Sequence, residues 1–284
     1  MRLAISACLA LAAASAIAQS WAWDDGTTPF VVSPPEVVER MLRLAAPKPG
    51  ERLVDLGSGD GRIVIEAAKR YGAQALGVDI DPRLVRLASE NARRAGVEGL
   101  ARFEVRDLFE TDLRGVQVVT LYLLPDVNRK LVPKLFAELA PGARVVSHDY
   151  DMGPWPFDEM IELPLAEKLV GPPGRSRIYL WVMPADARGT WLAELPGHGG
   201  RWRFAIAQRY QLLEVEASVA EGTVAVRGAR LRGDEIRLAV VGTVGGRGFL
   251  HLFRGRVAGA RIAGEVEISD GETSRTLPWI ATRE

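Results

Sequence analysis

Apolar and polar positions follow one pattern between residues 51 and 147. Short apolar runs of strand length alternate with stretches in which apolar residues recur at helical spacing. The runs predict strands at 52–56, 74–78, 102–105, 116–122 and 144–147, and the spaced stretches predict helices at 61–71, 82–95 and 127–139. Because strand, helix and strand in succession require parallel crossovers, we expect an α/β domain with a doubly wound, mostly parallel sheet.

Segments on either side complete this domain. Ser33 precedes two prolines, a pattern typical of a helix N-cap, so a first helix is predicted ahead of 47–50. Two apolar stretches, 160–169 and 178–183, have no helical pattern between them and predict an antiparallel hairpin at the sheet edge. The sheet is then expected to have seven strands. Asp81 is expected to cap the helix that begins at Pro82.

From residue 188 to 284 the pattern changes to short alternating runs separated by glycine-containing turns, with no helical period. This predicts a small antiparallel β-barrel or sandwich of about seven or eight strands. Gly189-Thr190-Trp191 and the late Arg283 resemble the start and end of lipocalin-like barrels. A stacked pair of these two residues would be a packing device through cation–π attraction. Further aromatic residues are expected in the core: Trp202, Phe249, Phe253 and Trp279.

The first residues have a pattern of their own. Arg2 precedes an apolar, alanine-rich run to residue 18 that ends in Ala16-Ile17-Ala18. This is typical of a cleaved signal peptide and is too short for a membrane span, although an uncleaved anchor or a buried helix would also fit. We expect a leader at 1–18, an α/β domain at 19–184 and a β domain at 188–284. The mature protein is expected to be periplasmic or extracellular, without a membrane span.

Composition narrows the chemistry. Lysine plus arginine and aspartate plus glutamate both number 36 in the 284 residues, so the net charge is zero and no nucleic-acid partner is expected. The only cysteine, Cys8, lies in the leader. A mature chain without cysteine has no thiolate metal site, and no metal site is expected.

The strongest motif is a strand that runs into the turn Gly57-Ser58-Gly59-Asp60-Gly61, followed by a helix. Alternate glycines allow a ligand to approach the backbone at the helix N-terminus. Asp79 closes the next strand, where a carboxylate can accept both hydroxyls of a ribose. A dinucleotide fingerprint would place its third glycine at Arg62. Asp55, before the first glycine, would repel a pyrophosphate but suits a cationic sulfonium and amino group.

The segments 55–61 and 77–81 resemble the first and second signatures of class I S-adenosylmethionine-dependent methyltransferases, and the likeness covers residues 30–183. It implies S-adenosylmethionine as cofactor. In that family the glycine turn packs on the methionine part, the acid matched by Asp79 holds the ribose, and an acid after the third strand meets the adenine amino group. The residues implied to bind the cofactor are Asp55, Gly57, Ser58, Gly59, Gly61, Asp79, Ile80, Asp107 and Leu108.

The methyl acceptor is expected at the carboxyl ends of the fourth and fifth strands. His148, Asp149 or Asp151 could supply a base there, and Tyr122 or Asn128 could orient an amine. No Asn/Asp-Pro-Pro-Tyr sequence is present, which argues against methylation of DNA bases. The stretch Tyr122-Leu123-Leu124-Pro125 is similar to small methyltransferases that include protein-lysine enzymes.

Two functions remain open from the sequence. The first is transfer of a methyl group to a protein side chain, lysine among them, or to a small molecule. The second is a non-catalytic binding protein that keeps the cofactor fold and whose β domain binds a partner or an envelope ligand. Export conflicts with the cytosolic supply of S-adenosylmethionine.

Overall fold

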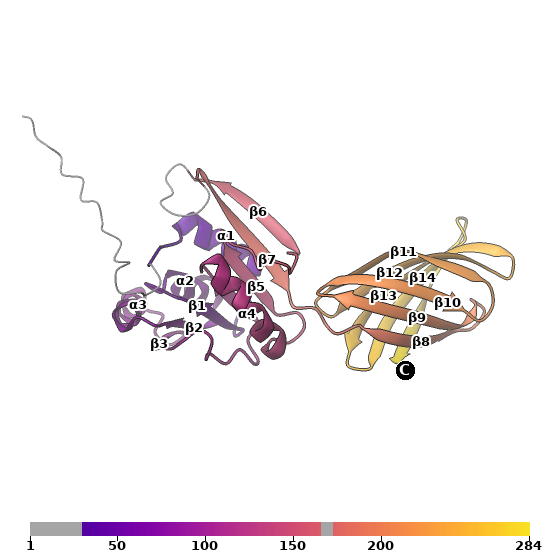
Figure 1. The fold of residues 1–284 in the computed structure, drawn as a ribbon, viewed down its shortest axis with the longest axis horizontal. Coiled ribbons are helices and arrows are strands. Elements are labelled where there is room, and N and C mark those ends of the chain that lie inside the picture. Colours follow the sequence, from indigo (N-terminus) through magenta and orange to yellow (C-terminus); the bar gives the residue numbers. More distant parts are fainter. Residues whose placement is uncertain (1–29, 166–172) are drawn as a thin grey trace, which may run out of the picture. The chain divides into compact units, whose positions relative to one another are not determined.

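The structure, a computed structural model, describes residues 30–165 and 173–284. The predicted leader, and the end of the stretch at 160–169, lie outside the described residues. The described chain forms two sheets, one mixed with helices packed on both faces and one entirely antiparallel (Figure 1). Among the described residues, no helix has the length and apolar character needed to cross a membrane.

The first sheet has the strand order β3-β2-β1-β4-β5-β7-β6, so β1 lies between β2 and β4. Strands β1 to β5 pair in parallel, whereas β7 pairs antiparallel with β5 and β6. The prediction of a mostly parallel sheet with an antiparallel edge hairpin is therefore confirmed. Its strands are β1 Arg52–Leu56, β2 Gln74–Asp79, β3 Ala101–Val105, β4 Val118–Leu121, β5 Arg144–His148, β6 Glu159–Pro164 and β7 Arg175–Val182.

Helices cover both faces of this sheet. Neighbouring residues of a strand point to opposite faces, and accordingly Leu53 packs in one apolar core and Val54 in another. The first core includes apolar side chains of α1, α2 and α3, and the second includes Leu131 and Leu135 of α4. Asp81 accepts a hydrogen bond from the Arg83 N–H and caps α3, as predicted. The helices are α1 Pro35–Ala45, α2 Arg62–Tyr71, α3 Pro82–Ala95 and α4 Pro125–Glu138.

Ser33 does not cap the first helix. The N-cap of α1 is Pro34, and no side chain caps this helix. The Ser33 hydroxyl instead lies 2.9 Å from Nδ1 of His148 in a buried contact. The local pattern correctly predicted the start of a helix, but the Ser33 hydroxyl contacts the distant His148 instead of capping that helix.

The second sheet is antiparallel and has the order β10-β9-β8-β15-β14-β13-β12-β11. Its outermost strands, β10 and β11, follow each other in the chain, and the sheet curls into a nearly closed barrel (Figure 1). Trp202, Phe253 and Trp279 are buried in its core, as predicted, and Phe249 packs against them half-buried. The strands are β8 Gly189–Leu195, β9 Gly200–Arg209, β10 Leu212–Val219, β11 Thr223–Arg232, β12 Glu235–Val244, β13 Arg247–Ala258, β14 Arg261–Ser269 and β15 Ser274–Arg283.

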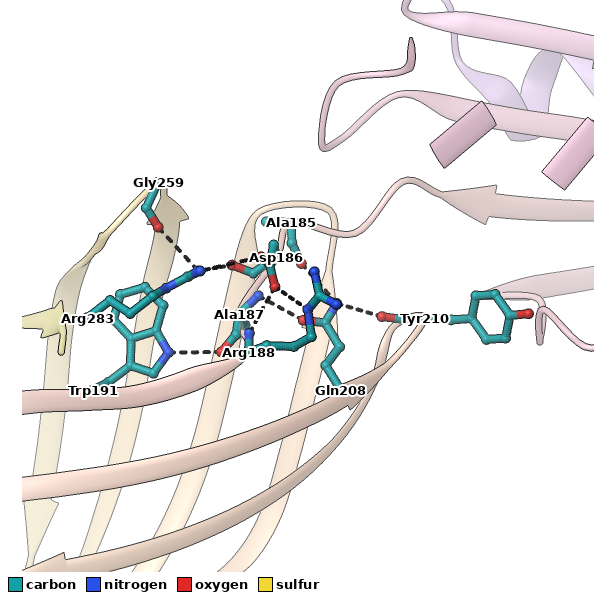
Figure 2. Close-up of polar contacts among 9 residues, drawn as sticks. All are labelled: Ala185, Asp186, Ala187, Arg188, Trp191, Gln208, Tyr210, Gly259 and Arg283. Carbon is teal, nitrogen blue, oxygen red and sulfur yellow. Dashed lines mark hydrogen bonds and ion pairs between the residues drawn. The ribbon is translucent and has the colours of Figure 1, made fainter. Parts of the chain in front are cut away.

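The barrel contains the predicted pair of Trp191 and Arg283. Figure 2 shows the guanidinium lying over the indole, with its carbon 4.7 Å from the ring centroid. The guanidinium also donates to the backbone carbonyls of Asp186 and Gly259. The indole N–H donates to the Ala187 carbonyl at 2.8 Å. This cation–π pair therefore anchors the barrel to the segment that leads into it.

Candidate active site

The turn between β1 and α2 depends on glycine. Gly57, Gly59 and Gly61 have φ angles of 81°, 54° and 81°, a region that side chains of L-residues disfavour. The N–H groups of Gly57 and Ser58 both donate to the Val78 carbonyl at 2.9 Å. The turn is thus fastened to the end of β2, where Asp79 follows.

Asp79 joins the two cofactor signatures directly. Its Oδ2 accepts a hydrogen bond from the Gly59 N–H at 2.9 Å, and its Oδ1 accepts one from the Asp81 N–H at 3.0 Å. Each carboxylate oxygen retains a free lone pair after accepting one hydrogen bond. The carboxylate can therefore hold the turn in place and still accept hydroxyl groups of a ligand.

Close packing around Phe103 of β3 explains two glycines of these signatures. A Cβ atom at Gly61 would lie 2.6 Å from the Phe103 ring, and one at Gly77 would lie 2.6 Å from the ring and 2.7 Å from Ser58 Cβ. A Cβ at Gly57 would lie 2.8 Å from a Leu123 methyl group. The glycines therefore let the turn, β2 and β3 approach one another as well as providing backbone freedom.

Asp55 lies at the base of the turn with 2% of its surface exposed. Its Oδ1 accepts a hydrogen bond from the Thr120 hydroxyl at 2.7 Å. Burial raises the pKa of this carboxyl to about 7, against the lowering effect of Thr120. A nearby cationic group would favour the ionised form of this carboxyl, and the ionised carboxylate would in turn attract the cation. Thr120 was not anticipated from the sequence.

An apolar surface adjoins Asp79. Ile80, Val105 and Phe109 are 61%, 55% and 41% exposed although all three are large and hydrophobic. Ile80 follows β2, Val105 ends β3 directly beside Asp79, and Phe109 lies in the next turn. Exposed apolar side chains at the carboxyl ends of neighbouring strands provide a flat contact for an aromatic base.

Asp107 lies in the turn after β3, with its side chain exposed. Its Oδ1 accepts a hydrogen bond from the Phe109 N–H at 2.8 Å, so the carboxylate also shapes that turn. The neighbouring Leu108 is half-buried against the core.

The chemical groups of S-adenosylmethionine match the polar and apolar groups of this site. Ser58 has a buried hydroxyl without a hydrogen-bond partner in the described part of the chain. A buried polar atom without a partner is costly, and a bound ligand would satisfy it. The turn with Ser58 would hold the amino-acid part, Asp79 the ribose and the apolar surface the adenine. Asp55 would offset the positive charge.

The predicted acceptor residues also meet. The rings of Tyr122, after β4, and His148, at the end of β5, have centroids 4.0 Å apart. Asp149 Oδ2 lies 3.4 Å from both the Tyr122 hydroxyl and His148 Nε2. Burial and, next, the Asp149 charge raise the pKa of Tyr122, so its phenol stays protonated at neutral pH. Tyr150 stacks 6.4 Å from Tyr122 and completes a half-exposed aromatic wall.

His148 is 1% exposed and has partners at both ring nitrogens. Ser33 Oγ lies 2.9 Å from Nδ1, and Ser176 Oγ, from β7, lies 2.7 Å from Nε2. A ring held on both sides and covered by Tyr122 is suited to positioning Tyr122 and Asp149. Neither serine was expected here, because a hydroxyl that pairs across the fold leaves no local sequence pattern.

Asp149 has an unusual backbone, with φ at 63° in the left-handed region. Its N–H donates to the Arg177 carbonyl at 2.6 Å, and its Oδ1 accepts from the Arg177 N–H at 3.1 Å. Strained conformations held by surrounding hydrogen bonds are common at functional sites. Here they fix the carboxylate beside the tyrosine hydroxyl.

Asn128 of α4 is fully buried, and its amide N–H groups face the backbone. They lie 3.1 and 3.3 Å from the carbonyls of Tyr150 and Asp151, and 3.2 Å from Ser147 Oγ. These contacts order the loop after β5. Asn128 thus supports the loop that carries Asp149. Asn128 is fully buried, whereas Tyr122 is half-exposed.

Comparison with known proteins agrees with this geometry. The ANTKMT methyltransferase domain family matches residues 55–159. A protein-lysine N-methyltransferase of Saccharolobus islandicus (strain REY15A) is 43% identical over 136 residues, which are 48% of this chain and 84% of that protein. The mouse adenine nucleotide translocase lysine N-methyltransferase is 41% identical over 45% of this chain and 55% of its own length.

A solved structure is also similar. It is an RNA methyltransferase from Salinibacter ruber in complex with S-adenosyl-L-homocysteine, 50% identical, with a TM-score of 0.49 over 54% of this chain and 93% of its own. The Saccharolobus islandicus relative, covered over 84% of its length, shows that the chain belongs to the class I S-adenosylmethionine-dependent methyltransferase family. Its activity is methyl transfer, and its cofactor is S-adenosylmethionine.

Proposed function

We propose that the protein methylates the side-chain amine of lysine in a protein substrate. The observation that carries this proposal is the grouping of Tyr122, His148 and Asp149 at the strand ends where an acceptor would enter. The named activities of the Saccharolobus islandicus and mouse relatives support the choice of lysine. Nothing in the structure favours a non-catalytic binding protein over an enzyme.

A lysine amine must lose a proton before it can attack, because the ammonium form has no lone pair. Bound S-adenosylmethionine supplies an electrophilic methyl group whose bond to sulfur breaks as the bond to nitrogen forms. The Asp149 carboxylate can attract the ammonium and accept its proton. Tyr122, kept protonated, can hydrogen-bond the amine or Asp149, and its ring can contact the cation.

The test is transfer of tritiated methyl groups from S-adenosylmethionine by the full chain into a protein extract, an RNA extract and a small-molecule fraction. We expect label in protein, recovered as methyl-lysine after complete hydrolysis. Label in RNA alone, or in small molecules alone, would contradict the proposal while leaving methyltransferase activity intact.

Two variants locate the reaction. Asp149→Asn and Tyr122→Phe should each lower kcat about a hundredfold or more, as expected for loss of a group that assists proton transfer. Asp126→Asn is the matched control, because this exposed carboxylate at the start of α4 pairs only with Arg129 among the described residues. Unchanged kcat in both site variants would remove these residues from the mechanism.

We further propose that the protein is exported, on the pattern of residues 1–18 alone. N-terminal sequencing of the protein purified from its native cells should begin near Gln19. A sequence that begins at Met1 would contradict cleavage of the leader.

A further inference from the structure

The barrel contains two buried imidazoles without hydrogen-bond partners. His198, in the turn between β8 and β9, is 4% exposed, and His251 of β13 is fully buried. Both ring nitrogens of each residue lack a partner within the described part of the chain. Buried polar groups are almost always paired, so four such nitrogens at one place require a physical explanation.

The two rings lie close together in an edge-to-face arrangement. Their centroids are 5.8 Å apart, with the ring planes at 73°. A nitrogen ligand lies about 2.0 Å from a metal and about 1.1 Å from its own ring centre, so two imidazoles that share a metal have centroids about 4.4 to 6.2 Å apart. The observed separation falls in this range.

The surroundings of the pair are aromatic. The indole of Trp202 lies 4.9 Å from the His251 ring, and the Phe249 ring lies 5.2 Å from the His198 ring. Aromatic faces attract cations.

We propose that His198 and His251 bind one Cu(I) ion as a two-coordinate site inside the barrel. Imidazole is a suitable ligand for copper. Zinc sites usually take four ligands, and no group of three or more histidine, cysteine, aspartate or glutamate residues is assembled anywhere in the described residues. A monovalent ion that accepts two ligands therefore fits better than a divalent ion.

One neighbouring charge opposes a cation. The exposed Arg275 of β15 lies near enough to His198 to contribute to the lowered pKa of that imidazole. Replacement of this arginine by glutamine should tighten copper binding. If the imidazoles instead bound an anion, the same replacement would weaken the binding of that anion. Arg275→Gln therefore distinguishes a cation site from an anion site.

The experiment titrates the full chain with Cu(I), kept reduced by ascorbate, against the chromogenic chelator bicinchoninate. We expect one copper per chain, with X-ray absorption showing two nitrogen neighbours. His198→Phe and His251→Phe retain an aromatic ring and should each weaken binding by more than about a hundredfold, since even outer-shell changes reach that figure. Circular dichroism and the Tm without copper verify that the variants fold.

Three results would overturn the proposal: no copper retained by the folded wild-type protein, phenylalanine variants that bind copper as tightly as the wild type, or weaker copper binding in Arg275→Gln. All three are measured without a methylation assay. The copper proposal therefore stands or falls separately from the proposed lysine methylation.

Discussion

The Asp79 carboxylate accepts a hydrogen bond from the Gly59 N–H at 2.9 Å. This contact joins the residue that ends β2 to the glycine turn that precedes α2, twenty positions earlier in the chain. Both parts of the cofactor site are thereby held together by the protein itself. A ligand that needs both of them meets a site that is already arranged, which lowers the cost of binding.

Gly77 tests the packing of this site. Gly77→Ala places a Cβ against Phe103 and Ser58, so we expect the free energy of unfolding to fall by about 1–3 kcal/mol, the usual range for overpacking. Gly99→Ala is the control, because a Cβ there meets nothing within 4 Å. Urea unfolding measures both. Equal stability of the two variants would show that β2 and β3 can separate without cost.

Asp55 makes stability depend on pH. Its pKa is about 7 in the folded protein and 3.8 in an unfolded chain, so between these values the folded state binds more protons. The contribution of this group to the free energy of unfolding therefore decreases as pH rises from about 4 to 7, by up to about 4 kcal/mol. Asp55→Asn removes this contribution, so urea unfolding at pH 8 should show that the variant is more stable than the wild type. A wild-type-like pH profile in Asp55→Asn would contradict the assignment.

The same substitution should weaken cofactor binding. S-adenosylmethionine carries positive charge, and the ionised Asp55 offsets it. Wild-type affinity should increase as pH rises through about 7, the pKa of Asp55, whereas the affinity of Asp55→Asn should change little over that range. Calorimetry at several pH values measures this. Parallel pH profiles in the two proteins would place the positive charge elsewhere.

Ser176 should act through His148. Ser176→Ala removes the hydroxyl 2.7 Å from Nε2, so the imidazole loses a partner and Asp149 loses a fixed neighbour. We expect a lower kcat, an unchanged KM and a shifted pH profile of kcat. Ser89→Ala removes a helix hydroxyl that bonds the Val85 carbonyl and is the control. A loss of stability with an unaltered pH profile would mean that Ser176 serves only the fold.

Arg283 should stabilise the barrel through the shape of its guanidinium. Arg283→Lys keeps the charge but cannot stack on Trp191 and bond two carbonyls together, so we expect a loss of about 1–3 kcal/mol in the free energy of unfolding. Arg203→Lys, an exposed change on the outside of β9, should have little effect. Equal effects would show that the stack contributes no more than a surface charge.

The fold was predictable wherever a feature depended on neighbouring residues. Strand and helix periods, the Asp81 cap and the glycine turn are local patterns, and the structure contains each of them. The stack of Trp191 on Arg283 joins distant residues, yet it was expected from its resemblance to lipocalin-like barrels. The choice between barrel and sandwich was left open, because alternation does not determine which strands close a sheet.

The site was less predictable where a contact crosses the fold. Ser33 has the pattern of a helix cap, but its hydroxyl contacts His148, 115 positions away. Thr120 and Ser176 gave no signal, since a single hydroxyl in a strand is common. Tyr122, His148 and Asp149 lie at the strand ends, but the contacts among them could not be predicted from the sequence. The imidazoles of the barrel, in particular, left no spacing pattern that suggests a metal.

Calorimetric titration of S-adenosylhomocysteine into the wild-type protein and Asp79→Ala tests the central claim most directly. We predict one binding site in the wild type and a loss of about 1.5–3 kcal/mol in binding free energy for the variant, the value of a hydrogen bond to a charged group. Equal dissociation constants, or no binding by the folded wild type, would contradict a cofactor site formed by the glycine turn and Asp79.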